Sequence, residues 1–202
     1  MTKIKLCGLS RPCDIEAANE LKPDYIGFVF APKSKRYVTP ETARGLKQML
    51  SPGIQAVGVF VNETPEAVAK LLQDGVIDVA QLHGAEDEVY MTRLRRLTDR
   101  PIIKAFRMEP GIDLQAVAQS TADFVLLDSG AGTGTVFDWK RIQTVKRPYF
   151  LAGGLDADNA SAAVRLLRPY AVDVSSGIET DGRKDKRKMA AFVAAVRKEE
   201  QT

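Results

Sequence analysis

The segment KIKLCGLSRP, from Lys3 to Pro12, is the stretch that decides the fold of this chain. Apolar and polar residues alternate through its first half, as they do along a β-strand, and Gly8 ends the alternation. Helix signals follow at once, because Ser10 is predicted to cap a helix and the proline suits its first turn. Cys7 is therefore predicted at the carboxyl end of a first strand, immediately before a turn into a helix.

The same order, a strand followed by a helix, repeats along the whole chain. Most of the predicted strands are short, apolar and β-branched, which is typical of strands that are covered on both faces. The predicted strands are 3–7, 25–30, 55–61, 79–83, 101–106, 123–128, 148–154 and 171–179. The predicted helices are 11–21, 40–50, 64–75, 87–97, 114–120, one that begins at 139, 157–167 and 186–198. Thr39 is predicted to cap the second helix, and Asp138 the helix at 139.

Eight strand–helix units with no break in composition predict a single-domain (β/α)8 TIM barrel over residues 1–202, an α/β fold with short helices and loops. An open, doubly wound sheet is the alternative. Such sheets more often stop at about five or six strands and carry a dinucleotide-binding GxGxxG after the first one. No GxGxxG follows the first strand of this chain, so the barrel is favoured.

The composition argues against several classes of protein. The chain has 202 residues, of which 45% are apolar, and its net charge of +3 is too small to indicate nucleic-acid binding. No run of about 18 apolar residues is present and the N-terminus lacks the apolar core of a signal peptide, so no membrane association is predicted. Two cysteines without metal-ligand spacing predict no metal site and indicate a reducing, cytoplasmic setting. The sequence leaves open whether the chain is a monomer or a homodimer.

Function in such a barrel is expected where the strands end. Cys7 there is either a reactive thiol or a small buried apolar residue. Asp128 follows four apolar residues, which would raise its pKa and suit a general acid, although a helix cap or loop anchor explains it equally well. His83, the only histidine, is either a pocket residue or a packing residue. The predicted strand ends also carry Asn62 and Arg107.

Three further features lie near the same edge. Arg36 belongs either to a solvated basic loop or to a site where its planar fork holds a carboxylate. Gly153–Gly154 and Ser175–Ser176–Gly177 follow the last two strands and expose backbone N–H groups, so we expect them to bind phosphate, with plain turn formation as the alternative. The glycine-rich stretch Gly130–Gly134 is expected to form a lid, because it lacks the GK[ST] ending of a phosphate loop.

An ordered set of motifs connects these residues to a known family. The motifs are KLCGL, GFVFAPKSKRYV, VGVFVN, QLHG, LLDS with FDW shortly after it, AGGL and VDVSSGIE, and they occur in this order from Lys3 to about Lys186. With this set the chain resembles the phosphoribosylanthranilate isomerase family, small TIM-barrel enzymes of tryptophan biosynthesis. A single motif such as AGGL carries little weight, but the ordered set is specific.

The resemblance implies an Amadori rearrangement of N-(5-phosphoribosyl)anthranilate to 1-(2-carboxyphenylamino)-1-deoxyribulose 5-phosphate. It implies Cys7 as general base, ionised at the start, and Asp128 as general acid, protonated at the start. It implies that Arg36 holds the anthranilate carboxylate and that His83 lines the pocket. The implied phosphate-binding residues are Gly153, Gly154, Ser175, Ser176 and Gly177. The substrate's own nitrogen is the electron sink, so no cofactor is expected.

Two alternatives stay open for the function. One is another phosphosugar-converting barrel enzyme, and the other is a non-catalytic phosphosugar-binding barrel, which would need neither Cys7 nor Asp128. Strand alternation adds one expectation about the barrel interior. If Cys7 and Ser175 face the pocket, then Lys5 and Asp173 point inward one layer below and are predicted to form a buried ion pair, since the first and last strands are neighbours only in a closed sheet.

Overall fold

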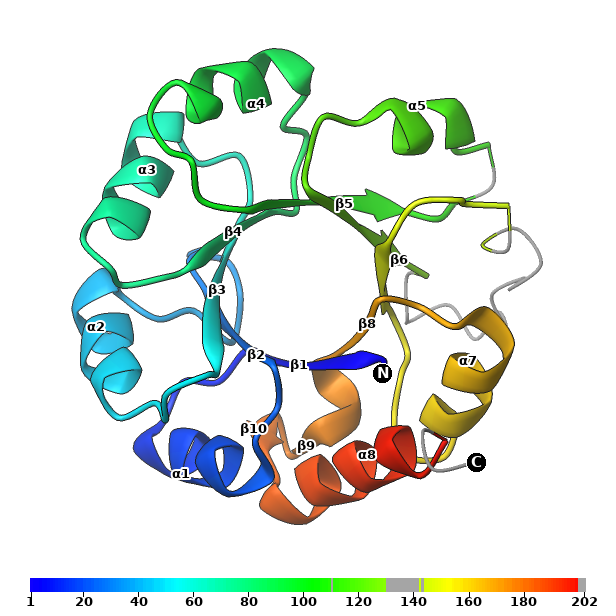
Figure 1. Cartoon of the computed structure of the whole chain (residues 1–202). Coiled ribbons are helices and arrows are strands. Elements are labelled where there is room, and N and C mark those ends of the chain that lie inside the picture. The colour runs from blue at the N-terminus through cyan, green and yellow to red at the C-terminus, as the bar shows by residue number, and fades with distance from the viewer. Residues whose placement is uncertain (110, 130–141, 143, 200–202) are drawn as a thin grey trace.

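Eight parallel strands close into a barrel in the computed structural model of the chain, which describes residues 1–109, 111–129, 142 and 144–199. Each strand is hydrogen-bonded to its neighbours in chain order, and β1 pairs with β8. Figure 1 looks along the barrel and shows the helices as a ring outside the strands. The strands are β1 (Lys3–Cys7), β2 (Tyr25–Val29), β3 (Gln55–Phe60), β4 (Val79–Leu82), β5 (Ile102–Arg107), β6 (Phe124–Asp128), β7 (Tyr149–Ala152) and β8 (Ala171–Val174). The predicted (β/α)8 architecture is confirmed.

Short polar side chains fix where the helices begin. Thr39 and Thr64 each accept a hydrogen bond from a backbone N–H in the first turn of α2 (Pro40–Gln48) and α3 (Pro65–Gln73), respectively. Each is followed by a proline, which suits the first helical position. The cap predicted at Thr39 is therefore confirmed, whereas Asp138 and the predicted lid Gly130–Gly134 lie outside the described residues. The α-helices of the described part are α1 (Pro12–Leu21), α2 (Pro40–Gln48), α3 (Pro65–Gln73), α4 (Glu88–Arg95), α5 (Leu114–Gln119), α7 (Ala160–Leu167) and α8 (Lys186–Lys198).

Two local predictions are wrong. Ser10 does not cap α1, because the carboxylate of Asp14 reaches back and accepts hydrogen bonds from the backbone N–H groups of Ser10 and Arg11. The last barrel strand ends at Val174 rather than at residue 179. After it the chain turns through a short 3₁₀ helix, η1 (Ser176–Ile178), into a hairpin of β9 (Glu179–Thr180) and β10 (Arg183–Lys184).

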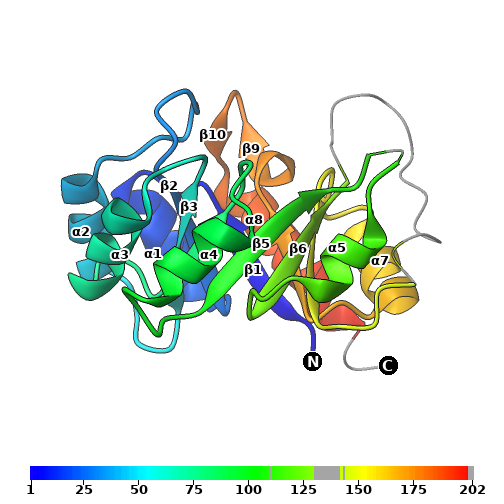
Figure 2. The same cartoon turned by 90° about the horizontal axis from the view of Figure 1, so that it is seen from above.

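The two ends of the barrel differ. Figure 2 shows the β9–β10 hairpin rising from one end, whereas the N-terminus lies at the other. The aromatic rings of Tyr25, Phe124, Phe150 and Tyr170 pack together inside the end near the N-terminus. The Phe124 and Tyr170 rings stack with their centroids 4.8 Å apart. This aromatic cluster fills the amino end of the barrel, so an inward-facing site is left at the carboxyl ends of the strands. None of the described helices is long and apolar enough to cross a membrane.

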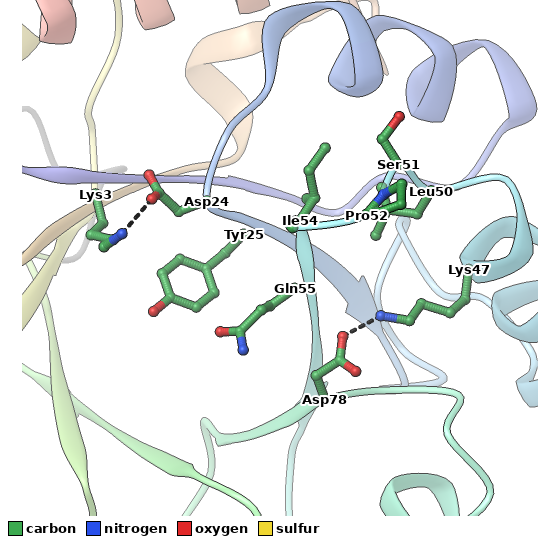
Figure 3. A pocket seen from close by; sticks show the side chains of 11 residues that line it. Lys3, Asp24, Tyr25, Lys47, Leu50, Ser51, Pro52, Ile54, Gln55 and Asp78 are labelled. Atoms are coloured by element: carbon green, nitrogen blue, oxygen red, sulfur yellow. Dashed lines mark hydrogen bonds and ion pairs between the residues drawn. The ribbon is translucent and has the colours of Figure 1, made fainter.

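A cavity of about 550 Å³ also lies on the amino-terminal side, beside the starts of β1 to β4. Figure 3 shows two ion pairs in its wall, Lys3 with Asp24 and Lys47 with Asp78. Each of these carboxylates also accepts a backbone N–H at the start of a neighbouring strand. The charges of this cavity therefore tie loops to strand ends, as stabilising residues at the amino end of a barrel do.

Candidate active site

A cavity of about 530 Å³ opens at the carboxyl ends of the barrel strands. Its wall brings together nearly all of the side chains and turns that the sequence singled out, from strands as far apart in the chain as β1 and β8. The predicted residues that line it are Cys7, Arg36, His83, Asp128, Gly153, Gly154, Ser175 and Ser176. Gly177 lies next to them in η1 but is not one of the described lining residues.

Cys7 ends β1, and its side chain is only 7% exposed. It pairs in register with Gly27 of β2, and a Cβ atom at position 27 would lie 2.7 Å from the Cys7 Sγ atom. No ordinary side chain fits at such a distance, so Gly27 is the residue that leaves room for the thiol. Cys7 and Cys13 are both free thiols, and Cys13 is exposed.

Charged groups surround the buried thiol. Burial raises the pKa of Cys7, the positive charges of Lys5 and Lys184 act to lower it, and Asp173 acts to raise it. The net effect is a raised pKa, so the thiol is neutral in the ligand-free protein near pH 7. This corrects the expectation of a thiolate at rest, and the reason is that desolvation outweighs the two cations.

The ion pair predicted beneath the thiol is confirmed. The Lys5 Nζ atom lies 2.9 Å from Asp173 Oδ1, and the two side chains are 0% and 8% exposed. Burial alone would lower the pKa of Lys5, but the charge of Asp173, together with that of Cys7 when the thiol is ionised, outweighs burial and raises it. Lys5 is therefore a fixed cation at the floor of the cavity.

Arg36 uses its planar fork on a protein carboxylate. Its Nε and Nη2 atoms donate to the two oxygens of Glu179 at 2.6 and 2.8 Å, and Lys184 donates to the same carboxylate at 2.6 Å. Burial alone would raise the pKa of Glu179, but the hydrogen bonds and charges of Arg36 and Lys184 lower it to about 2. The guanidinium is thus held in one orientation at the mouth of the cavity.

Asp128 belongs to a row of three hydrogen-bonded side chains. His83 Nε2 lies 3.2 Å from Asp128 Oδ2, and His83 Nδ1 lies 2.9 Å from Gln81 Nε2. Because an amide nitrogen can only donate, Nδ1 is the acceptor and Nε2 is the nitrogen that donates to Asp128. His83 is therefore a hydrogen-bonding partner of the carboxylate as well as a lining residue.

The two turns predicted for phosphate lie side by side at the ends of β7 and β8. Gly153 and Gly154 have positive φ angles of 89° and 64°. A Cβ atom at position 153 would lie 2.6 Å from Asp128 Oδ1, so this glycine also lets the turn approach the carboxylate. The Lys184 ammonium donates to the backbone oxygen of Ser175 at 2.8 Å and so places positive charge beside the second turn.

Other polar residues divide into those inside and those outside the cavity. Arg107 lines it, as expected from its strand end, whereas Asn62 does not: its side chain accepts from the Ala85 backbone N–H and so organises a loop. Sequence reasoning missed Gln81 and Glu109, which line the cavity, as well as the partners Glu179 and Lys184. The signal for Gln81 was present, because it lies two residues before His83 on the same face of one strand.

Comparison with known proteins gives a consistent result. Residues 4–195 match the family model of N-(5'phosphoribosyl)anthranilate (PRA) isomerase. An N-(5'-phosphoribosyl)anthranilate isomerase of Dechloromonas aromatica is 46% identical over 209 aligned residues, which cover 100% of this chain and 99% of the relative. The protein of the same name from Endomicrobium trichonymphae is 44% identical, over 98% of this chain and 99% of the relative.

A solved structure agrees with both sequence relatives. It is a crystal structure of phosphoribosyl anthranilate isomerase in complex with reduced 1-(o-carboxyphenylamino)-1-deoxyribulose 5-phosphate. It superposes with a TM-score of 0.87 at 34% identity, over 98% of this chain and 100% of the solved one.

Proposed function

The chain belongs to the N-(5'-phosphoribosyl)anthranilate isomerase family of tryptophan biosynthesis, and from that premise we propose which residues of its cavity perform the isomerisation. The proposed reaction converts N-(5'-phosphoribosyl)anthranilate to 1-(2-carboxyphenylamino)-1-deoxyribulose 5-phosphate. The observation that carries the proposal is that one cavity holds a thiol and a carboxyl group between a carboxylate-binding fork and two glycine-rich turns.

Asp128 is the proposed general acid. It donates a proton to the furanose ring oxygen of the substrate, the bond between that oxygen and C1′ breaks, and a protonated imine forms between C1′ and the anthranilate nitrogen. Gly153 supports this role because a Cβ atom at this position would lie 2.6 Å from Asp128 Oδ1, so only glycine leaves that space open. His83 holds the other oxygen.

Cys7 is the proposed general base. As a thiolate it removes the proton from C2′, and the electrons of that C–H bond move into the iminium to give an enolamine, which tautomerises to the ketone. The fixed charge of Lys5 beneath the sulfur, together with Lys184, favours the thiolate. The substrate nitrogen accepts the electrons, so this chemistry calls on no cofactor.

The remaining residues bind the ends of the substrate. Arg36 is held by Glu179 along its Nε–Nη2 edge, and the proposed role of its remaining N–H groups is to meet the anthranilate carboxylate. Gly153, Gly154, Ser175, Ser176 and Gly177 are the proposed phosphate-binding residues, with Lys184 adding positive charge at the second turn.

Loss of fluorescence of freshly made phosphoribosylanthranilate, added to the purified protein, tests the proposal directly. Cys7→Ser and Asp128→Asn should each lower kcat by about 10²- to 10⁴-fold with circular dichroism unchanged, whereas Cys13→Ser should keep full activity. Turnover by Cys7→Ser at the wild-type rate would remove Cys7 from the chemistry. Binding of the phosphosugar product without any turnover by the wild type would instead favour the non-catalytic binding barrel.

A further inference from the structure

We propose that Gln81 is a positioning residue for the acid: its amide fixes the tautomer of His83 and thereby leaves Asp128 as the group that carries the catalytic proton. The inference deepens the proposed function and rests on it for the role of Asp128. The state that it assigns to His83 is a property of the free protein and can be tested without substrate.

The geometry places Gln81 behind the acid. Gln81 lies in β4 and is 1% exposed, and its side chain shares a face of the strand with His83, two residues later. Its Nε2 atom is 2.9 Å from His83 Nδ1, and the opposite ring nitrogen is 3.2 Å from Asp128 Oδ2. The imidazole is thus held at both nitrogens, by an amide on one side and a carboxylate on the other.

The chemistry of the amide decides which nitrogen carries the hydrogen. The amide N–H of Gln81 needs an acceptor, so Nδ1 must be unprotonated and the neutral ring carries its hydrogen on Nε2. In an imidazolium, Nδ1 would also carry a hydrogen, so two N–H donors, one from the ring and one from the Gln81 amide, would point at each other. The amide contact therefore works against an imidazolium beside Asp128, and the carboxyl group is the proposed acid of the pair.

The carbonyl oxygen of the Gln81 amide bears on which orientation of the amide selects which tautomer of His83. The Gln81 Oε1 atom is buried and has no hydrogen-bond partner among the described residues. If the amide were turned over, Oε1 would accept from a proton on Nδ1, and the ring would be free to become an imidazolium. The two orientations of one amide therefore select opposite protonation of His83, and the observed orientation selects the neutral ring.

Nitrogen NMR of the imidazole tests the inference, because His83 is the only histidine in the chain and needs no assignment. The ligand-free protein is labelled with ¹⁵N-histidine, and the shifts of the two ring nitrogens, which differ between the two neutral tautomers and the imidazolium, are recorded over a range of pH. The wild type should show the tautomer protonated on Nε2. Gln81→Glu replaces the donor by an acceptor and should place a hydrogen on Nδ1. Gln81→Met removes the donor, so part of the protein should carry the hydrogen on Nδ1 even though Asp128 still accepts from Nε2.

Gln55→Glu is the matched control, since Gln55 lines the cavity at the opposite end of the barrel and the change adds the same charge. It should leave the tautomer unchanged. In the fluorescence assay Gln81→Glu should lower kcat by about tenfold or more, with a smaller change in KM. If Gln81→Glu does not fold, Gln81→Met gives the same test through its mixed tautomer.

The outcomes separate this inference from the proposed function. A wild-type ring protonated on Nδ1, or a tautomer that stays the same in both Gln81 variants, overturns the role of Gln81 even if the enzyme turns over normally. The predicted tautomers in a protein that does not turn over phosphoribosylanthranilate would uphold the geometry and refute the proposed function instead.

Discussion

Replacing Lys5 by methionine tests both the stability and the chemistry that the structure assigns to the floor of the cavity. Lys5 and Asp173 are a buried ion pair 2.9 Å apart, and their side chains are 0% and 8% exposed. Methionine keeps much of the volume of lysine but removes its charge, so Asp173 is left buried without its partner. The same change removes the cation beneath the thiol of Cys7.

The expected loss of stability follows from the burial of the pair. Removing one member of a buried ion pair costs about 3–5 kcal/mol, and the lower end applies here because Asp173 keeps some contact with the cavity. For a chain of 202 residues, about 3 kcal/mol corresponds to a fall in Tm of about 6–12 °C. The folded-state pKa of Lys5 is raised, so its contribution is fully present below its unfolded pKa of about 10.4 and is lost only as the pH rises through the higher folded value. The difference between wild type and variant should therefore be constant from about pH 6 to 9.

The second expected effect is on the thiol. Without Lys5 the pKa of Cys7 should rise further, because one of the two cations that lower it is gone. The pH dependence of alkylation by iodoacetamide measures this pKa, and a Cys13→Ser background removes the signal of the exposed thiol. Urea unfolding of the same proteins gives the loss of stability.

Lys104→Met is the matched control. Lys104 of β5 forms another strongly buried ion pair, with Glu86 at 3.1 Å, and its side chain is 8% exposed. It should lose comparable stability but leave the alkylation profile of Cys7 unchanged. A Lys5→Met protein within about 1 kcal/mol of wild type, or one whose thiol titrates like that of Lys104→Met, would refute the reasoning.

Three further changes test separate parts of the site. Arg36→Lys keeps the charge but loses the planar fork, so KM should rise by about 5- to 30-fold (about 1–2 kcal/mol) with a smaller change in kcat; equal KM values would remove Arg36 from the site. Gly27→Ala places a Cβ atom 2.7 Å from the Cys7 sulfur, so steady-state kcat should fall by about a hundredfold, and full activity would show that the thiol position is not critical. The pKa of Glu179 is lowered to about 2, so the stabilisation from its charge is present above about pH 4.3 and is lost as the pH falls through 2. When the pH is lowered from about 4.3 to 2, urea unfolding should therefore show a smaller loss of stability for Glu179→Gln than for the wild type. Equal losses for the two proteins would contradict this role of Glu179.

The sequence was sufficient for the barrel and for the groups at its carboxyl edge, because both depend on periodic patterns. Alternation along the first and last strands predicts that Lys5 and Asp173 face inward, and closure of the sheet makes them neighbours, as the structure confirms. The same rule places Cys7 above them. The end and the inward face of each strand can be read from the local sequence, and the known order of strands in a closed barrel then says which of these residues are neighbours.

Contacts that involve loops or hairpins could not be predicted in this way, because these segments have no regular alternation of side chains. Arg36 and Glu179 are 143 residues apart, and the hairpin that brings them together follows a strand that ends five residues earlier than the sequence pattern indicated. The cap of α1 shows the same limit at short range: Ser10 has the right side chain, but the longer reach of the Asp14 carboxylate satisfies two N–H groups at once. The family resemblance implied an ionised thiol, but the cost of burying that charge depends on the folded structure, where it outweighs the two nearby cations.

That raised thiol pKa bears on the order of the two proton transfers. Lys5 and Lys184 already act on Cys7 in the free protein, and burial still keeps the thiol neutral. In the proposed reaction new positive charge arises only after Asp128 has protonated the ring oxygen and the iminium has formed, one bond away from the C2′ proton. This charge acidifies the C2′ proton and lowers the pKa of the nearby thiol. The thiol then gives its own proton to water and becomes the thiolate that takes the C2′ proton. The acid therefore acts first and the base is formed by its product, so the resting site does not expose a thiolate, the form of cysteine that is open to oxidation and alkylation.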